Sequence, residues 1–155
     1  MLGYMLDFEK SLTGQIIGRC PAFPDITVEA SDEDAVRKLL QTAIEACLFS
    51  AFKKKKLIPL PVKVSKNRPA ITFSVLVVSK IYLINTMIEK RIQKTEFARR
   101  LNCHMQQVDR LLDFSHASKI ERVEEGLKVL GRGLELRPSD HVFDELSVQM
   151  LRKSG

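Results

Sequence analysis

The sequence predicts an α+β fold in which a small βββα unit precedes a cluster of short helices. Three observations predict it. Residues 2–30 hold short segments rich in apolar and β-branched side chains, which is typical of strands. Residues 31–52 then follow a long helical periodicity. After a Pro- and Lys-bearing connection at 57–69, several short helical patterns alternate with polar turns.

The composition limits the class of protein. A chain of 155 residues forms one ordinary domain or two small ones, and a hydrophobic content of 45% is typical of a globular protein. The net charge of +6 is compatible with a nucleic-acid partner but does not establish one. No apolar run is long enough to cross a bilayer and no signal peptide is recognisable. Three widely spaced cysteines indicate reduced thiols rather than metal ligands, so we expect a cytoplasmic protein without metal or cofactor.

The first 30 residues are expected to form three strands. Residues 2–20 read as two strands joined by a turn around 10–14, and residues 27–30 as a third. Pro21 and Pro24 lie between them, and proline is excluded from a paired central strand because it has no N–H to donate.

Ser31 is expected to cap a helix that runs to about Phe52, because Asp34 follows it in the capping-box arrangement. Lysines 53–56 end this helix, where the helix dipole favours cations, and we interpret them as a solvated end rather than a phosphate site. The stripe expected to be buried contains Ala35, Val36, Leu39, Ala43, Ile44, Ala46 and Cys47.

So small a layer leaves part of its sheet uncovered, which predicts a partner or self-association. Asp7 and Glu9 lie on the predicted strands, where a metal-dependent nuclease would place carboxylates. Their spacing is also that of solvated strand residues, and nothing later in the unit supplies a convincing third ligand. A nuclease therefore remains the weaker interpretation of this half.

Residues 71–137 are expected to form a second, mainly helical unit. A strand is predicted over 71–78, and Ser79 is expected to cap the helix that follows it. Ser118 is expected to cap the last helix of the unit, through a second capping box that ends in Glu121. Residues 134–137 are predicted to form a short strand.

Between these elements lie two short helices, over 94–101 and 105–112, separated only by the turn Asn102–Cys103–His104. Asparagine adopts the left-handed conformation that ends a helix, so Asn102 suits this turn. Two short helices joined by a tight turn inside a helical cluster have helix-turn-helix geometry. This arrangement predicts a DNA-binding module.

The outward residues of the second short helix include glutamine and arginine, which make bidentate contacts to base edges in the major groove. Flanking cations are candidates for phosphate contacts. The predicted DNA-binding residues are Lys94, Thr95, Arg99, Met105, Gln106, Gln107, Arg110, His116 and Lys119, with Arg91 and Arg100 as further phosphate candidates.

The sequence resembles the HicB family of bacterial antitoxins, in the branch with a C-terminal helix-turn-helix of the phage-repressor type. The resemblance covers about residues 3–136 and follows the order "FPD", an Ala-rich helix, "LIPLP", "SVLVVSKIYLIN" and then the two short helices. The chain departs from the family's pattern at "EAS", which is shorter than the usual loop. It also departs at Gln93 and Lys94, where Thr-Gln is usual, and at Asn102, where the turn usually has glycine.

The resemblance implies a partial ribonuclease-H-like domain over 1–60 without nuclease activity, a linker over 61–70, and the helix-turn-helix domain over 71–137. Residues 138–155 are expected to add a C-terminal helix. The implied partners are a HicA-type mRNA interferase toxin, which docks on the first domain, and double-stranded operator DNA. A homodimer or homotetramer is expected, and no enzymatic activity.

A second hypothesis remains open. The chain would be a helix-turn-helix transcriptional regulator whose first half only oligomerises or senses a ligand, without a toxin partner. A neighbouring short reading frame that encodes a small basic protein distinguishes the two, because only the antitoxin requires it.

Overall fold

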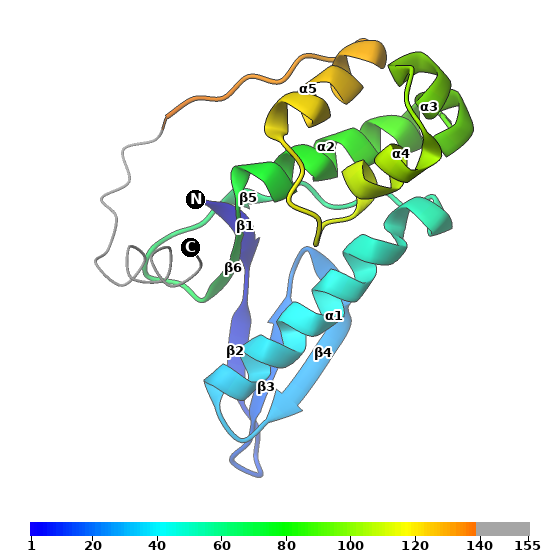
Figure 1. Ribbon diagram of the computed structural model, residues 1–155. Coiled ribbons are helices and arrows are strands. Elements are labelled where there is room, and N and C mark those ends of the chain that lie inside the picture. Colours follow the sequence, from blue (N-terminus) through cyan, green and yellow to red (C-terminus); the bar gives the residue numbers. More distant parts are fainter. Residues whose placement is uncertain (139–155) are drawn as a thin grey trace.

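The computed structural model describes residues 1–138 and shows an α+β fold, with two small antiparallel sheets and five helices in that part of the chain (Figure 1). In chain order the elements are β1 Leu2–Met5, β2 Asp7–Lys10, β3 Ile16–Cys20, β4 Phe23–Ala30, α1 Glu33–Lys54, β5 Val62–Lys63, β6 Ala70–Phe73, α2 Val75–Glu89, α3 Lys94–Leu101, α4 Met105–Leu112 and α5 Ile120–Val129.

One sheet has the order β2-β3-β4, and α1 packs across it (Figure 1). Its outer strand β4 begins at Phe23, four residues before the predicted start. The predicted strand was too short because it was started only after Pro24. Pro24 is tolerated because β4 pairs only with β3 and is therefore an edge strand.

The other sheet has the order β5-β1-β6, with β1 in the centre. The strand predicted for the first ten residues therefore divides at Leu6, whose N–H donates to the carbonyl of Pro69 at 2.8 Å. Each of its two parts joins a different sheet. The segment 61–70 contributes β5 and the first residue of β6. These two strands pair with opposite edges of β1, so both ends of the segment are held against the N-terminal strand.

The first helix, α1, begins one residue later than predicted, because Asp32 and not Ser31 is its cap. An Asp32 carboxylate oxygen accepts from the Ala35 N–H at 2.8 Å, and Ser31 Oγ donates to the other oxygen. The buried stripe is Val36, Leu40, Ile44, Leu48 and Ala51, whereas Leu39, which was expected inside, is 46% exposed. The lysine run ends the helix as predicted, with Lys55 in the left-handed region.

Gly18 of β3 is where α1 lies closest to its sheet. A Cβ at this position would lie 2.1 Å from a Val36 methyl and 3.0 Å from a Leu40 methyl. We expect Gly18→Ala to lower the free energy of unfolding by about 1–3 kcal/mol, because α1 must move away from the sheet. Urea unfolding measures the loss. Gly133→Ala is the control, since a Cβ there meets nothing within 4 Å, and equal stability of the two variants would contradict this packing.

The predicted strand over 71–78 is wrong in its second half. The strand β6 ends at Phe73, Ser74 caps α2 by accepting from the Val77 N–H, and the helix begins at Val75. Ser79 is no cap; its hydroxyl donates to the Val75 carbonyl. The sequence pattern at 75–78 was interpreted as a strand because α2 is apolar on most of its surface. A short apolar run does not distinguish a strand from a buried helix.

This apolar surface of α2 is explained by its position between two hydrophobic cores. Ile81 and Ile84 belong to the core formed with α1 and the sheets, whereas Leu83 and Met87 belong to the core formed with α3, α4 and α5. The Asn85 side chain also bonds to both the N–H and the carbonyl of Ile58, each at 2.8 Å. The helix α2 thus joins the two halves of the chain.

Two other predicted features of the C-terminal half differ in the structure. Ser118 is not a helix cap: its hydroxyl donates to the Arg110 carbonyl, and α5 starts at Ile120 after Lys119. Residues 134–137 form no strand, because no strand in residues 1–138 is paired with them. The helix predicted for the C-terminal segment falls on 139–153, which lies outside the described residues.

Candidate nucleic-acid interface

The two short helices are confirmed at the predicted residues. The helices α3 and α4 have eight residues each, and Asn102 between them has a φ of 49°, the left-handed conformation expected of it. The Cys103 N–H then donates to the Ala98 carbonyl at 3.0 Å, which closes the end of α3. The turn therefore follows from local sequence.

Apolar side chains position the pair on the rest of the helical cluster. Phe97 and Ala98 of α3 and Val108 and Leu111 of α4 are buried in one core with residues of α2 and α5. Burial of these two narrow stripes determines which face of each helix points outward.

The outward face of α4 carries Gln106, Gln107 and Arg110, all exposed, with Met105 at 40% exposure. Within residues 1–138, the side chains of the two glutamines and Arg110 make no hydrogen bond or ion pair. Their donors and acceptors are therefore available to an external partner.

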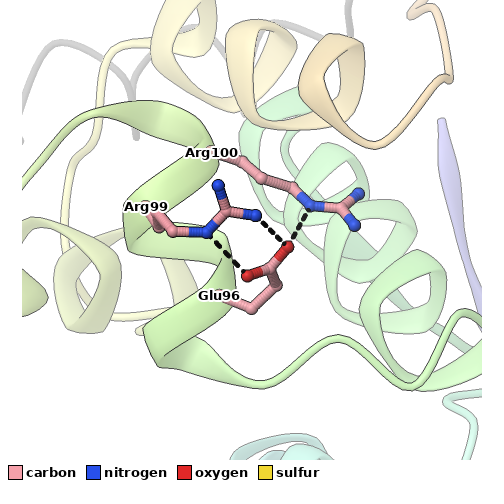
Figure 2. Close-up of polar contacts among 3 residues, drawn as sticks. All are labelled: Glu96, Arg99 and Arg100. Carbon is pink, nitrogen blue, oxygen red and sulfur yellow. Dashed lines mark hydrogen bonds and ion pairs between the residues drawn. The ribbon is translucent and has the colours of Figure 1, made fainter.

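Three of the predicted phosphate residues, Lys94, Arg99 and Arg100, are in contrast already paired. Lys94 Nζ lies 2.7 Å from a carboxylate oxygen of Asp109, which links the start of α3 to α4. Figure 2 shows Glu96 between Arg99 and Arg100. Arg99 donates to both carboxylate oxygens of Glu96, at 2.9 and 2.7 Å, and Arg100 Nε donates to one of these oxygens at 2.8 Å.

Three further candidates lie in the first turn of α3, in the loop after α4 and at the start of α5. Thr95 is exposed in the first turn of α3 and does not cap it, since Gln93 holds the cap position without a side-chain bond. His116 is half-buried in the loop after α4, with Nδ1 3.1 Å from Ser118 Oγ. Lys119 is exposed at the start of α5.

Lys80 helps to hold α4 in place, a role that was not predicted from the sequence. It is completely buried on α2, and its Nζ donates to the carbonyls of Arg110, Asp113 and His116 at 3.2, 2.5 and 2.7 Å. These carbonyls lie at the C-terminal end of α4 and in the loop behind it, where a cation is favoured by the helix dipole. Burial lowers the pKa of the Lys80 amine, and the nearby Asp113 carboxylate opposes this shift.

Comparisons with known proteins identify the family. Antitoxin HicB of Pseudomonas fluorescens (strain Pf0-1) is 34% identical over 140 residues, which cover 88% of this chain and 93% of the relative. The chain belongs to the HicB antitoxin family.

Two other HicB relatives are similar in extent. Antitoxin HicB of Escherichia coli (strain K12) is 31% identical over 122 residues, covering 77% of this chain and 88% of the relative. Antitoxin HicB 2 of Photorhabdus laumondii subsp. laumondii is 29% identical over 136 residues, covering 86% and 94%. No family model matches the sequence.

Membership of the HicB family also decides between the interpretations of Asp7 and Glu9. The relatives are named antitoxins, which are not enzymes, so this HicB chain is not a nuclease. In the structure each carboxylate is used in an exposed ion pair, Asp7 with Arg68 at 2.7 Å and Glu9 with Arg19 at 2.8 Å. Across residues 1–138 no helix combines the length and the apolar character needed to cross a membrane.

Acid should destabilise this HicB chain, because three carboxyl groups have lowered pKa values. The hydrogen bonds from Arg99 and Arg100 hold the pKa of Glu96 at about 2, and those from Ala35 N–H and from Ser115 lower the pKa values of Asp32 and Asp113. A carboxyl group whose pKa is lower in the folded than in the unfolded protein stabilises the fold at pH values above its unfolded pKa. This stabilisation is lost as the pH falls through the pKa of the folded state.

We therefore expect the free energy of unfolding to fall between about pH 4.5 and pH 2. Urea unfolding at a series of pH values measures it. The variant Glu96→Gln should lose less stability than the wild type over this range. An equal loss in both proteins would show that the Glu96 ion pairs do not contribute.

Proposed function

We propose that this HicB protein neutralises a HicA-type mRNA interferase toxin and represses its own operon by binding double-stranded DNA. One observation carries the DNA-binding part. Helix α4 is held by its buried face and by Lys80, while Gln106, Gln107 and Arg110 are exposed on its other face with their polar groups unused within residues 1–138. Such side chains read base edges in the major groove.

In this proposal α3 and α4 are a helix-turn-helix of the phage-repressor type, and α4 is the recognition helix. Met105, Gln106, Gln107 and Arg110 face the bases, and cations of α3 contact phosphates. Thr95, His116 and Lys119 lie at the borders of this surface. Two copies related by a two-fold axis, in a homodimer or homotetramer, would read half-sites about 34 Å apart.

The toxin-binding part is assigned to residues 1–60, as a partial ribonuclease-H-like domain, and the DNA-binding part to 71–137. The toxin-binding assignment is supported by the sheet β2-β3-β4, because α1 covers only one of its two faces. On the opposite face Glu9, Ile17 and Glu29 lie in one row across the strands. A surface of this kind would neutralise the toxin by covering its RNA-binding or catalytic face, with no reaction catalysed by the antitoxin. Both partners would be met in the bacterial cytoplasm.

Two measurements test the proposal. Co-expression with the product of the adjacent reading frame should yield a stable complex and relieve the toxicity of that product. The full chain should also shift a duplex from upstream of its own operon more strongly than a random duplex. If the duplex is shifted but no complex forms, the chain is a transcriptional regulator without a toxin partner; if neither occurs, the proposal is wrong.

A further inference from the structure

The helices α3 and α4 carry four basic residues, of which three are held by acidic residues of the same two helices. Lys94 is paired with Asp109, and Arg99 and Arg100 share Glu96 (Figure 2). The fourth basic residue, Arg110 of α4, makes no polar contact through its side chain in the part of the chain that is described. The helices that would face DNA thus contain their own competitors for DNA phosphate.

The consequence for binding follows from counterion release. Binding to DNA of any sequence depends on how many phosphates the protein neutralises, and one phosphate contact strengthens binding by about fivefold at 0.15 M salt. A basic residue that stays paired with a carboxylate does not contribute. The carboxylate also repels the phosphate backbone when DNA approaches.

These ion pairs are weak enough to be exchanged. All of the side chains involved are partly exposed, from 32% for Glu96 to 74% for Arg99, and exposed pairs add little to stability. On an operator, base contacts of α4 would hold the two helices close to the backbone, so that phosphates could replace the carboxylates. On a random sequence these base contacts would be missing, and the pairs would stay closed.

We propose that Glu96 and Asp109 are specificity-determining residues, which withhold Lys94, Arg99 and Arg100 from DNA of random sequence and release them on the operator. This inference rests on the DNA-binding function proposed above. It assigns the two acidic residues a role in discrimination and no role in reading bases.

The test compares Glu96→Gln with the wild type, as full chains, on a duplex from upstream of the operon and on a random duplex of equal length. Fluorescence anisotropy over a range of salt concentrations gives the affinity and the salt dependence for each DNA. For the random duplex we expect Glu96→Gln to bind about 5- to 30-fold more tightly, with a logarithmic salt slope steeper by about one to two phosphate contacts. On the operator the slope should stay unchanged, so the ratio of the two affinities falls.

Glu124→Gln is the matched control. It removes the same charge and opens an exposed pair with Lys128 at 2.9 Å, but it lies on α5, which carries none of the proposed base-reading residues. An equal gain in both variants would reduce the effect to net charge and overturn the inference. Weaker binding of Glu96→Gln to both duplexes would overturn it as well, because Glu96 would then position the arginines for phosphate.

Asp109→Asn provides a second variant if Glu96→Gln fails to fold, and should act in the same direction by releasing Lys94. A loss of operator affinity in Asp109→Asn, with the random duplex unaffected, would instead make Asp109 a base-reading residue and contradict the inference. If the wild type does not prefer the operator to the random duplex, the DNA-binding function itself is wrong. The two failures are therefore distinguishable.

Discussion

Replacing Lys80 by methionine is expected to lower the free energy of unfolding by about 3 kcal/mol. Methionine has a similar length but no donor, so the carbonyls of Arg110, Asp113 and His116 lose the bonds that the buried ammonium makes. The gain from not burying a charge offsets part of this loss. Urea unfolding of the full chain measures the difference.

Lys90→Met is the control for this variant, because Lys90 is exposed at the end of the same helix α2. We expect it to change stability by no more than about 0.5 kcal/mol. If Lys80→Met were as stable as Lys90→Met, the three hydrogen bonds would contribute nothing beyond the cost of burying the charge. The orientation of α4 would then depend on apolar packing alone.

Arg110→Ala is expected to weaken operator binding by about 1–3 kcal/mol, or roughly 5- to 150-fold, and to relax the preference for particular bases. The arginine is the cation of α4 that is free of partners within residues 1–138, and its fork matches guanine in the major groove. Gel-shift titration with the operator and with single-base variants measures both effects. Toxin neutralisation should be unchanged, because it is assigned to the other half of the chain.

The control is Arg122→Ala, which removes one positive charge from α5, where Arg122 is paired with Glu125. This variant should retain the base preference of the wild type. If both variants lost the same affinity, Arg110 would act only through its charge and would have no recognition role. If Arg110→Ala also abolished neutralisation, the assignment of the two functions to separate halves would be wrong.

The short helices of the candidate interface could be predicted from the sequence because their signals are local. Residues 94–101 and 105–112 repeat apolar side chains at helical spacing, and Asn102 supplies the left-handed end of α3. The start of α2 could not be predicted, since Val75, Val77 and Val78 are β-branched and apolar and thus typical of a strand. Their helical state is stabilised by burial in two cores at once, which no local window contains.

The roles of the charged residues could not be predicted from the sequence either. Lys80 stands in the apolar run "VLVVSKIYLIN", at helical spacing from Ile84 and Met87, and this spacing was the available signal for a buried lysine. The signal was hidden because Ser79 was interpreted as the start of the helix. Lys94 and Asp109 are separated by 15 residues, and their pairing depends on how α3 crosses α4.

The sequence by itself determined the α+β class, the lysine-terminated first helix, the paired short helices and the resemblance to HicB, because periodicity, capping and turn residues act over a few positions. Only the tertiary structure decided that β1 lies between β5 and β6, that α2 belongs to both cores, and that Glu96, Asp109 and Lys80 engage the candidate interface. The physical reason is that strand pairing, burial and ion pairing between helices depend on contacts between residues far apart in the chain. Their free energy is set by the packed fold and not by neighbouring residues.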